Sequence, residues 1–278
     1  MSLGVFLAVL GAAFLHALWN ALIKLGTSKV GTMVILSVIE VPIGLAVVAL
    51  SPPIDPAAIP WVIAAGCTHF AYKFFLTYAY DRGDLSRVYP IARGAAPMLV
   101  ALAGALLLPD AVSGRQYIAI AVLGLGILLM ARGVFSSGED RRLLPFALGS
   151  AAATATYTMI DGMGARISGA PAAYVAWVFV ADGLIFTLGM LALRGRSVLP
   201  RDARAWGLGS VASVASYGAY AVSIWAMTIA PIAVVAALRE TSILFAVLIG
   251  WIAFGERMSG EKALAATIIV AGVLLTRL

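Results

Sequence analysis

Charged residues are scarce in this sequence of 278 residues. Asp, Glu, Lys and Arg together make up 12% of it, whereas 62% of the residues are hydrophobic. A soluble domain is about half apolar and about a quarter charged, so this composition excludes a soluble globular protein and predicts an integral membrane protein. The net charge of +6 comes from basic residues spread over short links rather than from one basic surface. That distribution argues against nucleic acid as a partner.

Cysteine and histidine are almost absent, with one cysteine and two histidines in the chain. The single cysteine, Cys67, excludes an internal disulfide and a cysteine-rich metal site. The sequence contains neither HExxH nor GxSxG, and it has no histidine-rich cluster. We therefore expect no metal, no cofactor and no catalytic residues, which leaves a membrane-embedded enzyme as the weaker alternative. A pore is not indicated, because the sequence has no filter-like loop and no ring of like charges.

Apolar runs of roughly 20 residues recur along the chain, each long enough to cross a hydrocarbon core of about 30 Å. They are continuously apolar rather than alternating, which excludes a membrane β-barrel. The first run lacks the basic start and the cleavage motif of a signal peptide, so we expect it to remain as the first helix. The sequence thus predicts an all-α integral membrane protein with ten transmembrane helices. These are residues 3–23, 31–50, 58–80, 85–108, 115–132, 143–163, 171–193, 204–228, 231–254 and 261–277.

The two halves of the chain resemble each other. A shift of 146 residues lays 79–132 over 225–278 without a gap and places Arg93 on Arg239. Such agreement over more than fifty residues indicates an internal repeat.

The N-terminal part of each half aligns in nearby registers. A shift of 138 places Trp19 on Tyr157, and a shift of 142 places Glu40 on Asp182. These registers extend the repeat over the whole chain.

We therefore expect two five-helix repeats, residues 1–138 and 139–278. An odd number of helices inverts the second repeat in the membrane, which is the plan of secondary transporters with a site between the halves near the midplane. Lys and Arg concentrate in the links after the first, third, fifth, seventh and ninth helices. The positive-inside rule then places both termini outside the cytoplasm.

Two motifs carry a resemblance to a known family. "HALWNALIKLG" (16–26) resembles the first-helix motif of the EamA transporters of the drug/metabolite transporter superfamily, and "LRETSILFAVLIGWIAFGERMSGEKALAATIIVAGVLL" (238–275) resembles their second-repeat signature with its G-E-R turn. Residues 97–129 carry a degraded copy in the first repeat. The resemblance covers essentially the whole chain. It implies ten helices and the export of small metabolites, since relatives handle amino acids, including aromatic ones, and other small polar solutes.

Ionisable residues inside the apolar runs are the first candidates for a site, because they are costly in a membrane and commonly face a cavity or a partner. Arg93 and Arg239 each lie eight residues into their segments, about 12 Å deep at helical rise. We expect one cationic contact near each entrance, for a substrate carboxylate or a gate. The alternative is that each arginine pairs with an acid and pins two helices. Glu240 needs a partner outside its own helix. Lys73 is the candidate, and it either binds substrate or neutralises Glu240 or Glu40.

Two further acids, Glu40 and Asp182, are candidates to carry protons in a coupled transport cycle. The alternative is that each carboxylate makes a structural hydrogen bond inside the bundle.

Aromatic and polar side chains that share helix faces complete the predicted site. Trp19 and Tyr157 lie deep in their segments and match across the repeat, which favours a cavity lining over a helix contact. The full set of predicted substrate-binding residues is His16, Trp19, Asn20, Tyr72, Lys73, Tyr78, Arg93, Tyr157, Tyr217, Tyr220, Arg239 and Glu240.

The sequence therefore predicts a monomeric exporter of small polar metabolites in the bacterial inner membrane, with a small-molecule substrate and the lipid bilayer as its partners. Amino acids, and aromatic ones in particular, are the leading substrate class. Cationic drugs, nucleosides and sugar derivatives are the alternatives. Alternating access through a central cavity is the expected mechanism.

Overall fold

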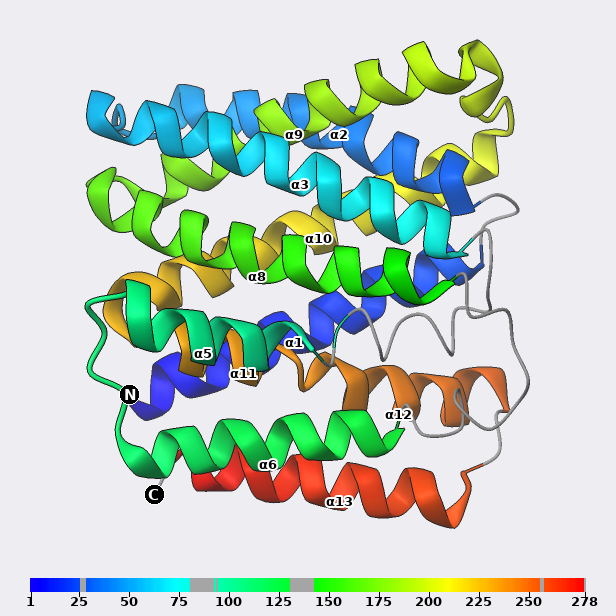
Figure 1. Ribbon diagram of the computed structural model, residues 1–278. Coiled ribbons are helices and arrows are strands. Elements are labelled where there is room, and N and C mark those ends of the chain that lie inside the picture. The colour runs from blue at the N-terminus through cyan, green and yellow to red at the C-terminus, as the bar shows by residue number, and fades with distance from the viewer. Residues whose placement is uncertain (26–28, 81–92, 94, 131–142, 256–257, 278) are drawn as a thin grey trace.

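The computed structural model describes residues 1–25, 29–80, 93, 95–130, 143–255 and 258–277, and these residues form an all-helical protein without strands. The long helices lie side by side along one common direction (Figure 1). Their bounds are α1 (Leu3–Lys24), α2 (Lys29–Leu50), η1 (Pro56–Ala58), α3 (Ile59–Tyr80), α5 (Ala96–Leu107), α6 (Gly114–Met130), α8 (Leu143–Ile167), α9 (Pro171–Arg194), η2 (Arg196–Val198), α10 (Ala203–Ile229), α11 (Ile232–Arg239), α12 (Ser242–Phe254) and α13 (Gly260–Leu275).

The prediction of an all-α membrane protein is confirmed. Four stretches within the described residues are long and apolar enough to cross a membrane: Leu3–Ile23, Val30–Leu50, Pro171–Arg194 and Ile232–Ala253. The outer surface is rich in exposed leucine and isoleucine, for example Leu106 at 82% exposure. Seven charged side chains, by contrast, are buried between the helices. An apolar exterior around a polar interior is the distribution that a bilayer requires.

The predicted ninth segment, 231–254, is not one continuous helix. Pro231 caps its start, but α11 ends at Arg239 and α12 begins only at Ser242. At the break the Thr241 backbone N–H donates to the Leu238 carbonyl at 3.0 Å, a tightened turn with a three-residue spacing. Arg239 and Glu240, the adjacent charged residues of this segment, therefore lie at the break between the two helices. Backbone groups without intrahelical hydrogen bonds are tolerated at membrane depth only where they face protein or a water-filled cavity rather than lipid.

The predicted fourth segment, 85–108, is described only from residue 93 onward, apart from residue 94. Its helix α5 begins at Ala96, and α12 begins at Ser242, so the two helices start 146 residues apart. This is the same spacing that aligns the two halves of the sequence.

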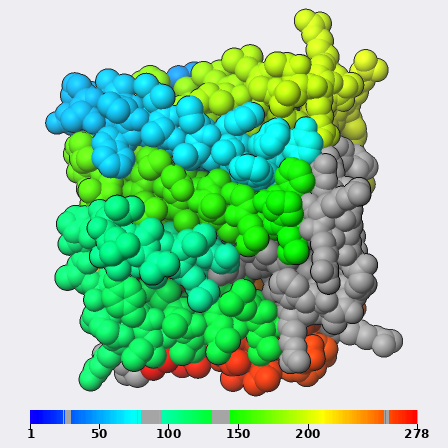
Figure 2. Space-filling model, viewed as in Figure 1, coloured from blue at the N-terminus to red at the C-terminus, as the bar shows by residue number. Residues whose placement is uncertain are grey.

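Helices of the first half pair with helices of the second. The most extensive contacts join α3 to α8, α2 to α9, α6 to α13 and α1 to α10. In Figure 1, α6 and α13 lie side by side at one edge of the molecule, and α2, α3 and α9 lie at the other. Figure 2 shows the intervening face as a continuous packed surface from α9 and α3 through α8 to α5 and α6.

Glycines make the contact between α6 and α13 close and reciprocal. A Cβ added to Gly126 would lie 2.7 Å from the Ile269 side chain, and one added to Gly272 would lie 2.7 Å from the Leu123 backbone nitrogen. Gly272 follows Gly126 by 146 residues, and Ile269 follows Leu123 by the same number. Small residues at such seams let lipid-embedded helices approach closely.

Both termini lie at the same end of the helices (Figure 1), where Arg277 Nη1 donates to the Met1 carbonyl at 2.9 Å. The link between α2 and α3 reaches this end too, since the Asp55 backbone N–H donates to the Ser168 carbonyl at 2.9 Å. Termini on one side are what an even number of membrane crossings requires.

Candidate functional site

Ionisable side chains gather in the interior of the helix bundle, and we call this set the ionisable centre. Each is less than 8% exposed, although each belongs to a residue type that is seldom buried without a partner. Its members are Glu40, His69, Lys73, Arg93, Asp161, Asp182, Arg239 and Glu240.

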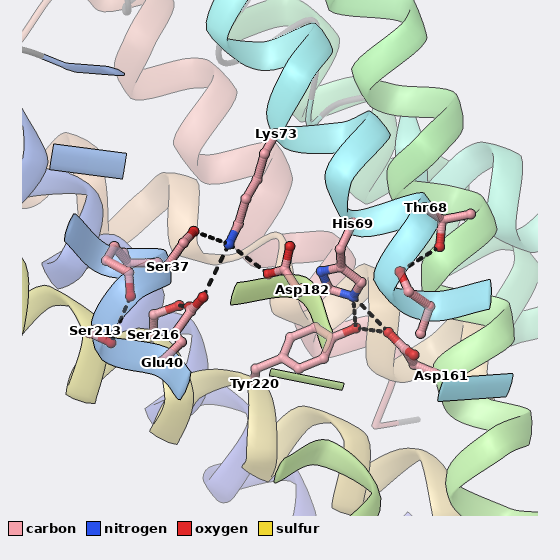
Figure 3. Close-up of polar contacts among 12 residues, drawn as sticks. Ser37, Glu40, Thr68, His69, Lys73, Asp161, Asp182, Ser213, Ser216 and Tyr220 are labelled. Carbon is pink, nitrogen blue, oxygen red and sulfur yellow. Dashed lines mark hydrogen bonds and ion pairs between the residues drawn. The ribbon is translucent and has the colours of Figure 1, made fainter. Parts of the chain in front are cut away.

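Lys73 of α3 lies between two carboxylates from neighbouring helices (Figure 3). Its Nζ donates to Asp182 Oδ2 at 2.6 Å and to Glu40 Oε2 at 3.1 Å. The same amine donates to the Ser37 hydroxyl at 2.8 Å, which completes the three bonds that an ammonium can make. Ser216 of α10 donates to the other oxygen of Glu40 at 3.4 Å. Asp182 Oδ1 is buried and has no hydrogen-bond partner among the described residues. Two acids against one ammonium leave this part of the centre short of positive charge.

His69, one turn before Lys73 on α3, contacts a third acid. Its Nε2 lies 2.8 Å from Asp161 Oδ2 and 3.2 Å from the Tyr220 hydroxyl. Tyr220 also donates to Asp161 Oδ2, and Tyr174 donates to Asp161 Oδ1 at 3.1 Å. The His69 ring stacks on Tyr157 with their centroids 4.1 Å apart. Side chains of α3, α9 and α10 therefore converge on one buried carboxylate of α8. Figure 3 shows His69 and Tyr220 beside Asp161.

Arg93 and Glu240 form a two-bonded ion pair at the break between α11 and α12. Arg93 Nε donates to Glu240 Oε2 at 3.0 Å, and Arg93 Nη2 donates to Oε1 at 2.8 Å. Both side chains are about 1% exposed. Two parallel N–H···O bonds are the strongest form of arginine–carboxylate contact. Arg93 therefore occupies both carboxylate oxygens of Glu240.

Arg239 makes weaker contacts than Arg93. Its Nε lies 3.9 Å from Glu240 Oε1, beyond hydrogen-bond distance, and has no hydrogen-bond partner among the described residues. Its Nη2 donates to the Thr158 hydroxyl at 3.2 Å. The guanidinium carbon lies 5.9 Å from the ring centres of both Tyr157 and Tyr220. Arg239 is thus a buried cation held by two aromatic rings and a hydroxyl, without a carboxylate of its own.

Two expectations about the charged residues are wrong in detail. Glu240 pairs with Arg93, not with Lys73, whose acids are Glu40 and Asp182. The two arginines do not stand apart near separate entrances, because both side chains turn inward to the same Glu240 carboxylate. The interpretation of Lys73 as a partner of Glu40 is confirmed.

The alignment of Glu40 with Asp182 stays a prediction. The two helices that carry these acids approach closely at glycines: a Cβ on Gly44 of α2 would lie 2.6 Å from the Ala176 carbonyl oxygen, and one on Gly183 of α9 would lie 2.6 Å from the Ser37 carbonyl oxygen. Both acids reach Lys73 from this pair of helices.

The aromatic face predicted on α1 exists. The Trp19 indole N–H donates to His16 Nδ1 at 3.1 Å, and the Asn20 amide donates to the His16 carbonyl at 2.8 Å. His16 lies within electrostatic reach of Arg93 and Arg239. Its Nε2 is buried and has no hydrogen-bond partner among the described residues. This free ring nitrogen is a polar atom that a solute can use.

The predicted tyrosines divide into two groups. The ring centres of Tyr72 and Tyr157 lie 5.5 Å apart, and the Tyr220 ring contacts the His69 ring. These side chains therefore lie against the ionisable centre. Tyr78 lies apart from them, against Phe74, Phe146 and Arg194 toward one end of α3. Tyr217 packs edge-on against Phe179, with ring centres 5.0 Å apart.

His69 and Asp161 are residues that the sequence did not place in the site. Two signals point to them: His69 precedes Lys73 by one helical turn, and Asp161 is an acid in an apolar segment. That segment was predicted to end at 163, whereas α8 continues to Ile167, so Asp161 lies well inside the helix. No group of three or more His, Cys, Asp or Glu side chains within the described ranges has the geometry to hold a metal ion.

Comparisons with known proteins give a family and a fold. Residues 142–278 match the profile described as the EamA-like transporter family. A solved structure described as "Crystal structure of protein" is similar with a TM-score of 0.75 and 19% sequence identity, covering 98% of this chain and 94% of that chain. A comparison with curated proteins gives no match.

Proposed function

Since the chain belongs to the EamA-like transporter family of the drug/metabolite transporter superfamily, a family of membrane transporters, we propose that it exports small zwitterionic metabolites, with aromatic amino acids as the leading class. We place it in the bacterial inner membrane as a monomer. The proposal names Arg239, the acids beside Lys73 and the aromatic rings between them as the solute site.

The observation that carries the proposal is the weak pairing of Arg239, whose Nε lies 3.9 Å from the nearest carboxylate oxygen among the described residues and has no hydrogen-bond partner there. A buried guanidinium without a carboxylate is costly, whereas a carboxylate that accepts two of its N–H groups satisfies it. Its neighbour Glu240 is already bound by Arg93 through two hydrogen bonds. The free Nε therefore suits the carboxylate of a solute.

The opposite charge lies beside Lys73 of α3, on Glu40 of α2 and Asp182 of α9. Asp182 keeps one oxygen without a hydrogen-bond partner among the described residues. An ammonium group of a solute satisfies that oxygen and adds a cation beside these two acids. A positive and a negative group on one small molecule match these two places.

Aromatic rings connect the two ends of the proposed site. Arg239 lies over Tyr157, and His69 stacks on the same ring one turn before Lys73. Small-molecule sites are commonly lined by aromatic side chains with a few convergent polar groups. An aromatic side chain of the solute fits this lining.

We further propose alternating access by the two five-helix repeats, residues 1–138 and 139–278, around the ionisable centre. The pairing of first-half with second-half helices supports this arrangement, as does the reciprocal contact of Gly126 and Gly272. Discontinuous helices at a repeat interface are how many secondary transporters build their sites. The break between α11 and α12 carries Arg239 and Glu240 in that manner.

The solute class is tested by counterflow in proteoliposomes with the purified protein. Radiolabelled phenylalanine is compared with phenethylamine, which lacks the carboxylate, and with 3-phenylpropionate, which lacks the amine. We expect phenylalanine to exchange and both analogues to fail. Exchange of phenethylamine or of lipophilic cations, but not of phenylalanine, contradicts the proposal and favours an exporter of cationic drugs. A chemically altered product identifies an enzyme instead.

One end of the proposed pathway is closed by Arg166 of α8. Its Nη1 donates to Asp110 Oδ1 at 2.6 Å, its Nε to the Met227 carbonyl at 2.8 Å and its Nη2 to the Ala230 carbonyl at 3.1 Å. Asp110 in turn accepts from the Ile232 backbone N–H, the first of α11, at 2.7 Å. This cluster ties α8 to the α5–α6 link and to the junction of α10 with α11.

Asp110→Asn is expected to open this end. Hydrogen bonds to charged groups contribute about 1.5–3 kcal/mol, so the ratio of open to closed molecules rises by about 10–100-fold. The measurement is the rate at which a membrane-impermeant thiol reagent labels a Val234→Cys variant in a Cys67→Ser background. Asp55→Asn is the matched control, because Asn retains the helix cap that Asp55 provides at the same end. Equal labelling rates for the Asp110 variant and this control contradict the expectation.

A further inference from the structure

We propose that His69 and Asp161 form a proton-binding site that couples solute export to a proton gradient. This inference rests on the proposed transport function, and it assigns the proton to residues other than Glu40 and Asp182.

The charge of the ionisable centre is the first argument. Four carboxylic acids and three cationic side chains are buried together: Glu40, Asp161, Asp182 and Glu240 against Lys73, Arg93 and Arg239. The centre is therefore one positive charge short when its histidine is neutral. An unbalanced charge buried away from water is costly, so the closed arrangement favours one additional proton.

The hydrogen bonds offer two places for that proton. One is the pair of acids that share Lys73, and the other is Asp161, whose basic partner within hydrogen-bond distance among the described residues is His69. Imidazole is the side chain whose charge ordinarily changes between pH 5 and 8. We therefore assign the proton to the His69–Asp161 contact.

The tyrosines hold the Asp161 carboxyl in place. Tyr220 and Tyr174 both donate to Asp161, one to each oxygen, and His69 Nε2 lies 2.8 Å from the same carboxyl. Figure 3 shows the contacts of Tyr220 and His69. An ionised carboxylate accepts at both oxygens. In the proposed proton-loaded state the proton is on His69, and the imidazolium donates to the Asp161 carboxylate.

Other charged and titratable groups face this contact from every element packed on α8. They are Lys73 of α3, Tyr174 and Asp182 of α9, Tyr220 of α10, Arg239 of α11 with Glu240 and Arg93 beyond it, and Tyr157 of α8 itself. The surrounding cations Lys73 and Arg239 oppose the imidazolium, and the acids favour it.

Proton binding and release then change the stability of the closed arrangement. With the proton on His69, the contact joins α3 to α8 and the centre is neutral. When the proton leaves to the less acidic side, the centre carries a net negative charge, and opening to water becomes favourable. One proton enters from the acidic side and leaves on the other in each cycle, opposite to the exported solute.

The coupling is tested with radiolabelled phenylalanine in proteoliposomes with and without a pH gradient. For the unmodified protein we expect the gradient to drive accumulation against the solute gradient. Asp161→Asn should lose at least tenfold of the gradient-driven accumulation ratio, a larger loss than that of counterflow without a gradient. Glu261→Gln, an exposed acid on α13, is the control and should behave like the unmodified protein. Accumulation that survives in Asp161→Asn overturns the coupling, and so does counterflow that ignores the gradient in the unmodified protein.

A second measurement is independent of the solute. The chain has two histidines, so in a His16→Gln variant the labelled imidazole signal in a magnetic resonance spectrum belongs to His69. We expect the His69 signal to show a bound proton within the range from pH 5 to 9, and the signal of the protonated ring to be lost in the same variant with Asp161→Asn. A histidine that stays neutral over this range overturns the proton site, even if phenylalanine is transported. Failure of phenylalanine counterflow with a titrating His69 overturns the solute assignment instead.

Discussion

Replacing Glu240 with glutamine is expected to lower the free energy of unfolding by about 3–5 kcal/mol, one of the two largest effects expected for this protein. The carboxylate accepts both bonds of Arg93 and lies 3.9 Å from Arg239 Nε. Its removal leaves two guanidinium groups in the interior without a counter-charge. The measurement is thermal unfolding in detergent, followed through the six tryptophans.

The double variant Arg93→Met and Glu240→Met tests whether stability depends on the ion pair itself or only on leaving one partner without its counter-charge. Replacing a buried ion pair by apolar side chains of similar volume is often neutral, so most of the lost stability should return. Glu261→Gln is the surface control, for which the change stays within about 0.5 kcal/mol. A Glu240→Gln protein that unfolds like the unmodified protein but does not transport would make Glu240 a solute ligand, as its place among the predicted substrate-binding residues implies.

This test matters because the sequence could not distinguish these roles. Two adjacent charged residues in an apolar segment cost free energy in a membrane, and therefore predict a functional or structural role. The structure places both at a helix break. Periodicity reports which residues share a face of one helix, but not which helices are neighbours. Of the two acids proposed for Lys73, Glu40 is its partner and Glu240 is not, while α9, which packs against α3, supplies Asp182 as the second acid.

Helix bounds were predicted well where a proline marks the start of a helix. The segment 171–193 became Pro171–Arg194, and Pro231 caps α11. The break at Glu240 and Thr241 was not predicted, since the apolar run continues through it and neither residue is a strong helix breaker. A break of this kind is decided by tertiary contacts, here the pairing of Glu240 with Arg93.

The repeat stays a prediction, although one of its registers has structural support. The shift of 146 agrees with the starts of α5 and α12 and with the reciprocal contact of Gly126 and Gly272. In the pair of α2 and α9 the alignment followed chemical similarity of two acids, whereas packing follows the small residues. Glycine positions are therefore the better guide to register between lipid-embedded helices.

The other large effect is expected for Arg239→Gln, which should abolish transport of phenylalanine and leave stability almost unchanged. Truncating one partner of a buried, hydrogen-bonded charge pair costs about 2–5 kcal/mol, which corresponds to a loss of at least about 30-fold in affinity. Arg239 makes only a 3.9 Å contact with Glu240, which keeps its two hydrogen bonds from Arg93 when Arg239 is replaced, so this substitution costs the fold far less than Glu240→Gln. Binding and stability therefore respond in opposite ways to the substitutions at Arg239 and Glu240.

Three comparisons sharpen the test of Arg239. Arg239→Lys keeps the charge but loses the planar fork, so we expect a partial loss of phenylalanine counterflow. Thr158→Val removes the hydroxyl that holds Nη2 and should weaken binding less than Arg239→Gln. Arg201→Gln, at an exposed position before α10, should leave counterflow intact. If Arg239→Gln exchanges phenylalanine at the unmodified rate, the solute carboxylate binds elsewhere and the assignment of this site is wrong. A second outcome is that Arg239→Gln loses phenylalanine exchange but gains phenethylamine exchange, while Arg239→Lys still exchanges phenylalanine. In that case Arg239 selects solutes that carry a carboxylate.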